Sequence, residues 1–288
     1  MSATNTTKKS TVSLTFGDVA ENHKGMQQVG TLADVGFDLS DLQRMQKWFE
    51  ATGKAECRLV ALHEFLPSDI HENKTLGLDA YILIIKNGVN AIFGRDDAAN
   101  DMLMEQSGLE TDKKAIMYGH VVNKHARHNL CFGETHQDPD YEAGKGTIYA
   151  FDEVPMLKRV RESLREIIGD EKGTQLQAEG NYYYDHTKCG IGFHGDAERK
   201  KVFAVRLGEP IPLCYSWFKA GNKVGDIIRF DELGHGDIYV MSEKTTGFDW
   251  KRSSIYTLRH AAGAAKYLKI PDKPIGEAGK AGKKRKMA

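Results

Sequence analysis

The sequence predicts an α+β fold with a β-sandwich or jelly-roll core. From residue 178 onward, short β-rich runs follow one another at regular spacing, divided by Gly, Asn, Asp and Lys, which is typical of sandwiches and jelly rolls. A periodic helical pattern lies directly before these runs, and mixed helical and strand patterns lie upstream. The 288 residues suffice for one substantial core and a smaller second one.

The upstream part opens with a helix over 39–52, which Ser40 can cap. Its apolar residues recur at helical spacing: Leu42, Met45, Trp48 and Phe49. Residues 57–63 have the composition of a strand. The sequence therefore predicts helix and strand in alternation before the main core.

A hairpin is predicted around Asn87-Gly88. Two apolar runs, 81–85 and 89–93, flank this dipeptide, which readily supplies the two positive φ angles of a tight hairpin turn. We therefore expect two paired strands here.

A second helix is predicted over 153–168, with Pro155 in its first turn and Gly169 at its end. The apolar residues of one face suit packing against a sheet. The predicted strands that follow are 181–184, 190–194, 201–207, 211–218, 225–230, 236–242 and 253–259.

Composition and charge exclude some classes of protein. The chain has 40 basic and 40 acidic residues and no apolar run long enough for a membrane span. Its four cysteines form no CxxC pair, so we expect free thiols and an intracellular protein. The basic residues of 277–288 suggest a nuclear localisation signal, a phosphate-binding arm or a solvated tail on a slightly acidic body. The location is thus expected to be cytoplasmic or nuclear.

Three His-x-Asp pairs are the first candidates for chemistry. They begin at His136, His194 and His235. Residues two apart on a strand project from one face, so an imidazole and a carboxylate can reach one cation. Eleven histidines allow such pairs to arise by chance, so context must choose among them.

The context of His194 is distinctive. It ends the run Asn181-Tyr-Tyr-Tyr-Asp-His-Thr-Lys-Cys-Gly-Ile-Gly-Phe-His194-Gly-Asp196. This run resembles the core of AlkB-like 2-oxoglutarate- and Fe(II)-dependent dioxygenases, in which an Asn-x-Tyr strand precedes a His-x-Asp strand. The resemblance covers about 150–262.

Two upstream segments, 18–27 and 121–132, look like a region that accompanies this core in algal and large-virus relatives. The resemblance implies a double-stranded β-helix (jelly-roll) core at 150–268 and an N-terminal α+β extension at 13–149, which would form an outer layer and substrate lid. Residues 1–12 and 269–288 are predicted to be disordered, because they are polar or follow prolines without periodicity.

The resemblance also assigns roles to residues. His194 and Asp196 would bind Fe(II) and leave positions for 2-oxoglutarate and O₂. Asn181 and Tyr183, two apart on a strand, would hydrogen-bond the cosubstrate; taken alone they would indicate a half-buried strand, but their context favours the cosubstrate role. Arg259 would bind a carboxylate of 2-oxoglutarate through its planar fork.

The third iron ligand departs from the family pattern. The histidine position holds Arg252, whose guanidinium stays protonated and cannot ligate iron. Asp249 could serve as a second carboxylate, His235 or His260 could reach the metal, or the site could use two ligands. We favour Asp249 or a two-ligand site, because His260 should face the opposite side of its strand from Arg259.

A second arginine that would contact 2-oxoglutarate is also absent from its family position. Ser253 stands where the family has another arginine, so either Arg252 supplies that charge or the contact is missing.

The segment NKHARHN holds the densest cluster of basic and imidazole side chains, His125, Arg127 and His128. A polar structural loop is the favoured interpretation, followed by a contact with substrate phosphate. A metal site is the least favoured.

The expected function is a dioxygenase that hydroxylates or oxidatively demethylates a substrate, with a methylated nucleobase in DNA or RNA favoured. One alternative is a catalytically impaired binding module that has lost the third ligand. Another is an oxygenase that acts on proteins or small molecules. Membrane association is not expected, and the sequence does not indicate an oligomeric state.

Overall fold

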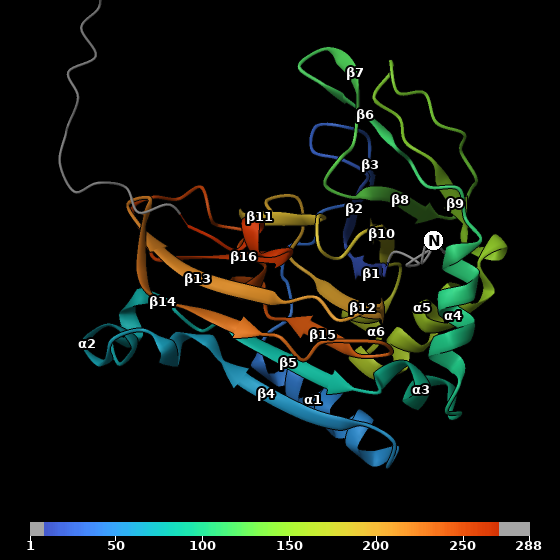
Figure 1. Cartoon of the computed structure of the whole chain (residues 1–288). Helices are drawn as coiled ribbons and strands as arrows, with labels where there is room; N and C mark the ends of the chain where they lie inside the picture. The colour runs from blue at the N-terminus through green and yellow to red at the C-terminus, as the bar shows by residue number, and fades with distance from the viewer. Residues whose placement is uncertain (1–8, 271–288) are drawn as a thin grey trace, which may run out of the picture.

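A computed structural model describes residues 9–270 and shows two facing β-sheets with helices packed on the larger one (Figure 1). The class is therefore mixed α+β, as predicted. The predictions of disorder for residues 1–8 and 271–288 concern residues outside the described range. Within the part that is described, no helix is long and apolar enough to cross a membrane.

The larger sheet has eight strands, and the first strand of the chain lies in its middle. Only β8 and β9 pair in parallel. In spatial order the strands are β4 (Glu56–Ala61), β5 (Tyr81–Lys86), β15 (Ile238–Met241), β12 (Val202–Gly208), β1 (Thr11–Gly17), β10 (Gln177–Tyr183), β8 (His128–Gly133) and β9 (Ile148–Ala150).

The smaller sheet is antiparallel and contains the His-x-Asp strand. Its order is β11 (Gly190–His194), β16 (Thr257–Gly263), β13 (Leu213–Lys219) and β14 (Asn222–Phe230). Two short hairpins complete the strands: β2 (Val19–Glu21) with β3 (Gln28–Gly30), and β6 (Lys114–Met117) with β7 (His120–Asn123). All seven strands predicted after residue 178 are present, although the last lies four residues later than expected.

The two predicted helices are confirmed as α1 (Leu39–Ala51) and α5 (Pro155–Ile168). Asp38, rather than Ser40, caps α1, because its side chain accepts from the Asp41 amide. The other helices are α2 (Ser68–His71), α3 (Gly88–Phe93), α4 (Ala98–Ser107), α6 (Asp170–Gly173) and α7 (Glu243–Thr246). Short 3₁₀ turns occupy Leu62–Phe65, Lys74–Leu76, Phe151–Glu153 and Ala265–Tyr267.

The predicted hairpin at Asn87-Gly88 is wrong. Asn87 does adopt a positive φ of 58°, but Gly88 begins helix α3 instead of a second strand. A side chain at Gly88 would meet Ile238 at 2.6 Å, so the glycine serves close packing on the neighbouring strand. The single positive φ at Asn87 redirects the backbone from strand β5 into helix α3.

Alternation along β1 divides the protein into two layers. Val12, Leu14 and Phe16 face the helices in one core, while Ser13 and Thr15 line a cavity on the other face. The first core contains residues of α1 and α5, and a second core packs between the two sheets beside this cavity.

The N-terminal region is part of the main sheet. β1 begins at Thr11, inside the segment expected to be disordered, because its β-branched and apolar residues pair with both β10 and β12. β4, β5, β8 and β9 also precede residue 150 and belong to this sheet. The boundary drawn at 149/150 therefore does not coincide with a break in the sheet.

Candidate metal centre

A cavity of about 660 Å³ opens between the two sheets. Its volume lies in the range of small-molecule sites. β1, β10 and β12 line one side of it, and β11 and β16 line the other. Of the sequence-predicted site residues, the cavity lining includes Asn181, Tyr183, His194, Asp196 and Arg127.

A β-bulge aims His194 into this cavity. The register of β11 against β16 shifts between Ile191 and His194, and such a shift re-aims the side chains that follow it. Gly195 then allows a close approach, because a Cβ there would lie 2.3 Å from the Gly247 carbonyl oxygen. The next amide, that of Asp196, donates to the Thr246 carbonyl at 2.9 Å. The His-Gly-Asp turn is therefore held by α7 and the residue that follows it.

His260 is the third member of the centre. It lies on β16 directly opposite His194, and the two ring centroids are 4.4 Å apart. Ligand atoms of His194, Asp196 and His260 all lie within 4.8 Å of one another, which is compatible with a single cation among them. Within residues 9–270, this is the group that brings three such donors together.

The hydrogen bonding around the centre favours a cation. Nδ1 of His194 lies 2.8 Å from the Gly192 carbonyl, which can only accept, so Nδ1 carries the proton and Nε2 has a free lone pair. This Nε2 faces Asp196 Oδ1 at 3.4 Å, and Nε2 of His260 faces the same oxygen at 3.6 Å. A cation between them converts an unfavourable contact of lone pairs into coordination. The donor set therefore fits a divalent metal.

Burial sets the protonation of these ligands. It lowers the pKa of His260 to about 3, although the neighbouring Asp196 opposes this shift. Burial alone would raise the pKa of Asp196, but the neighbouring imidazoles of His260 and His194 hold it well below its usual range. At neutral pH the centre therefore presents a carboxylate and a neutral imidazole, the forms that bind metals.

A buried ion cluster supports the centre from beside it. Arg199 contacts Glu179 at 2.6 Å and Glu198 at 3.2 Å, and all three line the cavity. Burial raises the pKa of Glu198 to about 7. Sequence reasoning missed Arg199 and Glu179, because no local pattern marks a long-range pair.

A search for relatives identifies a viral homologue. No protein-family model matches the chain. Over 262 residues it is 45% identical to "Uncharacterized protein R156" of Acanthamoeba polyphaga mimivirus, a match that covers 91% of this chain and 98% of the viral protein. The chain belongs to the family of this mimivirus protein. The relative's name states no activity.

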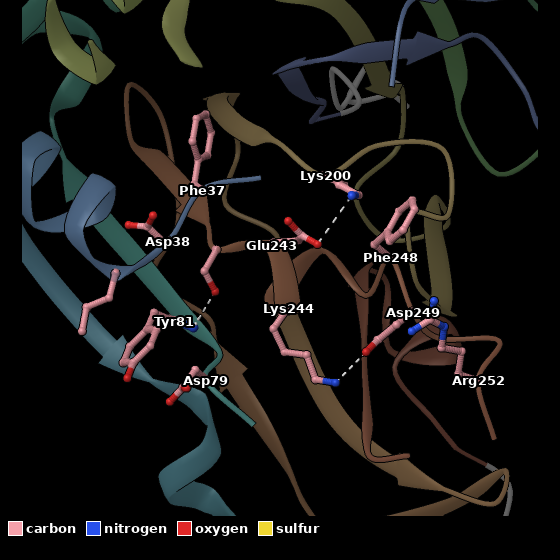
Figure 2. Close-up of a pocket in the computed structure, with 12 residues that line it drawn as sticks. Phe37, Asp38, Asp79, Tyr81, Lys200, Glu243, Lys244, Phe248, Asp249 and Arg252 are labelled. Carbon is pink, nitrogen blue, oxygen red and sulfur yellow. Dashed lines mark hydrogen bonds and ion pairs between the residues drawn. The ribbon is translucent and has the colours of Figure 1, made fainter. Parts of the chain in front are cut away.

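In this member of the mimivirus protein family, Asp249 does not join the metal centre. It lies in a different cavity, of about 630 Å³, where it accepts from the Lys244 ammonium at 2.6 Å (Figure 2). Arg252 lines that second cavity as well. The preference for Asp249 is corrected, because Lys244 already neutralises this carboxylate and His260 completes the group. His235 also lies elsewhere, where its ring contacts Asn100 and the Gly208 amide.

Arg259 points away from the centre. Its guanidinium lies 4.0 Å from the Phe218 ring centroid and 5.1 Å from that of Trp250. It is not among the described residues that line the cavity with the metal centre. The expected opposition of Arg259 and His260 across the strand is correct, but it is His260 that faces inward.

Asn181 and Tyr183 face the cavity together, as alternation predicts. The Asn181 side-chain oxygen already accepts from Arg127 Nε at 2.5 Å and from Asn129 at 2.9 Å. Asn181 therefore positions Arg127 at the cavity wall. Burial raises the pKa of Tyr183, so its phenol remains a donor at neutral pH.

The cluster in NKHARHN is divided by the fold. Only Arg127 lines the cavity with the metal centre, whereas His125 lines a separate surface cleft. His128 stacks on Tyr184, with ring centroids 4.6 Å apart. The structure therefore does not bring the three together as a metal site.

Proposed function

We propose that the protein is a 2-oxoglutarate- and Fe(II)-dependent dioxygenase with a double-stranded β-helix core. The supporting observation is the group of two imidazoles and one carboxylate, His194, Asp196 and His260, at the wall of a cavity between two sheets. This donor set is typical of non-haem iron oxygenases, because it leaves coordination positions for other ligands. With 2-oxoglutarate and O₂, the bound iron would supply the oxidation that inserts one oxygen atom into a substrate C–H bond and releases succinate and CO₂.

The protein's own residues prepare the site for this chemistry. Gly192 fixes the His194 tautomer, and the low pKa of His260 keeps its imidazole available as a ligand. The Asp196 carboxylate offsets one of the two positive charges of the metal. The Tyr183 phenol lines the same cavity from the larger sheet and could donate to a bound cosubstrate.

We propose a methylated nucleobase in DNA or RNA as the substrate. Lys24 and Lys251 line the cavity beside Arg127, and these positive charges suit a phosphate backbone. On an N-methyl group the hydroxymethyl product would release formaldehyde, whereas on a C-methyl group the hydroxyl would remain.

The hairpin β6–β7 supports a polymeric substrate. Lys124, directly after β7, donates to Asn22 at 2.6 Å, and Asn22 lines the cavity, so the hairpin rises from the cavity rim. Its turn presents Tyr118 at 96% exposure and a φ of 52°. An exposed aromatic ring on a short turn can stack on a base outside the cavity.

Succinate formation tests the proposal. Purified protein with Fe(II), ascorbate and 2-oxoglutarate should form succinate, and one methylated oligonucleotide should stimulate it over its unmethylated counterpart. His194→Ala and His260→Ala should abolish turnover, while Asp249→Ala should retain it. Absence of succinate from folded, iron-loaded protein with all oligonucleotides would refute the proposal.

Two alternatives have distinct outcomes. A binding module without turnover would lack a third metal ligand, and His260 offers a candidate for that position. Partner binding that survives His194→Ala, without turnover, would favour it. Succinate formation that only a protein or small molecule stimulates would instead favour an oxygenase of that substrate class.

A further inference from the structure

A buried arginine with no acidic partner among the described residues faces the cavity. The Arg206 side chain lies on β12, is only 1% exposed and lines the cavity together with the metal centre. Its Nε and Nη1 atoms have no hydrogen-bond partner, and no ion pair joins its guanidinium to a residue within the described range. The Tyr239 ring lies beside it, with the centroid 5.4 Å from the guanidinium carbon.

Arg199 shows what a compensated arginine looks like in the same cavity. It is also nearly fully buried, but Glu179 and Glu198 both contact it. Burying a charge costs several kcal/mol unless a counter-charge and hydrogen bonds offset it. Arg206 carries this cost with no protein carboxylate in contact, so a ligand is needed to supply the negative charge.

The neighbours of Arg206 are suited to a carboxylate. Ser13 on β1 is its register partner, and Thr15 and the phenols of Tyr183 and Tyr239 line the same cavity. Hydroxyl groups can donate to a carboxylate, and the planar guanidinium can bind it through two parallel hydrogen bonds. The site thus combines one fixed positive charge with neutral donors.

We propose that Arg206 binds a carboxylate of a small organic acid in this cavity. If the proposed function holds, on which this step rests, the acid is 2-oxoglutarate and Arg206 binds the carboxylate distant from the metal centre. β12 and β16 belong to facing sheets, and such sheets lie about 10 Å apart, so a five-carbon diacid with its side-chain contacts can span them. Arg259, which sequence analysis assigned to this role, faces the Phe218 and Trp250 rings instead.

Three acids separate the carboxylate site from the metal centre. Isothermal titration of the full chain would use 2-oxoglutarate with Mn(II), which prevents turnover, and glutarate without metal, which has two carboxylates and no keto group. Pyruvate with Mn(II) supplies the keto acid but lacks the distal carboxylate. The variants are Arg206→Gln, Arg206→Lys and the matched control Arg259→Gln.

Arg206→Gln should weaken binding of 2-oxoglutarate and glutarate by roughly 10- to 100-fold. Arg206→Lys should fall between this variant and the wild type, because it keeps the charge and loses the planar fork. Arg259→Gln should bind all three acids with wild-type affinity. The affinity for pyruvate should be the same in the Arg206 variants as in the wild type. Without ligand, Arg206→Gln should melt no lower than the wild type, because it removes an uncompensated charge.

Several results would overturn the inference. Wild-type affinity in both Arg206 variants, a larger loss in Arg259→Gln, or no diacid binding to the wild type would each refute the site. If Arg206→Gln fails to fold, the argument from charge cost is wrong and Arg206→Lys decides the binding question. Arg206-dependent diacid binding without succinate formation on Fe(II) addition would instead uphold the site and remove the proposed oxygenase function.

Discussion

Arg199→Gln is expected to destabilise the fold strongly. The Arg199 side chain is 4% exposed and its partner Glu179 is 11% exposed, with 2.6 Å between Nη2 and Oε2. Removing one member of a buried pair leaves the other charge unpaired, which costs about 3–5 kcal/mol. Because 1 kcal/mol shifts the Tm of a chain of this size by a few degrees, the melting temperature should fall by roughly 6–20 °C.

The loss should also depend on pH. Burial already raises the pKa of Glu198 to about 7, and Arg199 opposes that shift. Without Arg199 the carboxylates carry uncompensated charge at pH 8, and protonation at lower pH relieves it. The destabilisation should therefore be larger at pH 8 than at pH 6.

Urea unfolding followed by tryptophan fluorescence measures this loss. Arg229→Gln is the matched control, because Arg229 is 47% exposed and pairs with Asp231 at the surface; its removal should cost about 0–1 kcal/mol. The reasoning is refuted if Arg199→Gln unfolds within 1 kcal/mol of the control, as ordinary surface pairs do. The same expectation fails if Arg206→Gln, which leaves no carboxylate unpaired among the described residues, lowers the free energy of unfolding as much as Arg199→Gln does.

Three further outcomes are expected. His260→Ala should weaken Co(II) or Mn(II) binding by more than the roughly 10- to 100-fold that loss of a residue outside the ligand set costs. Asp249→Ala should bind the metal like the wild type in the same titration. A larger loss in Asp249→Ala than in His260→Ala would identify Asp249 as the ligand. Tyr118→Ala should weaken single-stranded oligonucleotide binding roughly 5- to 100-fold by anisotropy, whereas Phe65→Ala, 54% exposed in another segment, should not; equal affinities would exclude stacking. In the folded protein the pKa of Glu198 is about 7, above its ordinary 4.5, so the folded state is destabilised as pH rises through 7 and the Glu198 carboxyl ionises. Glu198→Gln should therefore increase the free energy of unfolding at pH 8 by up to about 3 kcal/mol and leave it unchanged at pH 4.5, as measured by urea unfolding.

Local patterns predicted the two longest helices and the strands after residue 178. The periodic apolar residues of 39–52 and 153–168 correspond to α1 and α5, and turn residues separate the seven later strands correctly. The failure at Asn87-Gly88 has a tertiary cause, since the Val89 amide donates to the Gly236 carbonyl and Gly88 packs on Ile238. Contacts with a strand 150 residues away are not visible in a dipeptide.

Two of the three members of the candidate metal centre were predicted. His194 and Asp196 are close in sequence, so a motif can reveal them. The sequence disfavours His260 as a ligand, because it alternates with Arg259, which was expected to face the site. The alternation is correct, but His260 faces the site and Arg259 faces away from it. The strand runs over 257–263 rather than 253–259, and only pairing with β11 and β13 determines which side faces inward. A period of two does not specify a face.

Arg206 gave no signal in the sequence. In VFAVRLG it is one charge inside a buried apolar strand, a pattern equally compatible with an edge residue or a paired core ion. Its significance appears only when the absence of a partner within the described structure is established. Such residues require the packed structure rather than the pattern.

The central position of β1 has a consequence for synthesis of the protein. Thr11 pairs with Tyr183 on one side and Gly208 on the other, so both neighbours of the first strand are translated long after it. While the ribosome produces the intervening residues, β1 has no sheet to join, and its apolar face of Val12, Leu14 and Phe16 is exposed or held by a chaperone. Pairing at such sequence separation also slows folding. An expression fragment that begins at residue 150 would lack this strand and leave β10 and β12 with unpaired edges, open to association with other chains.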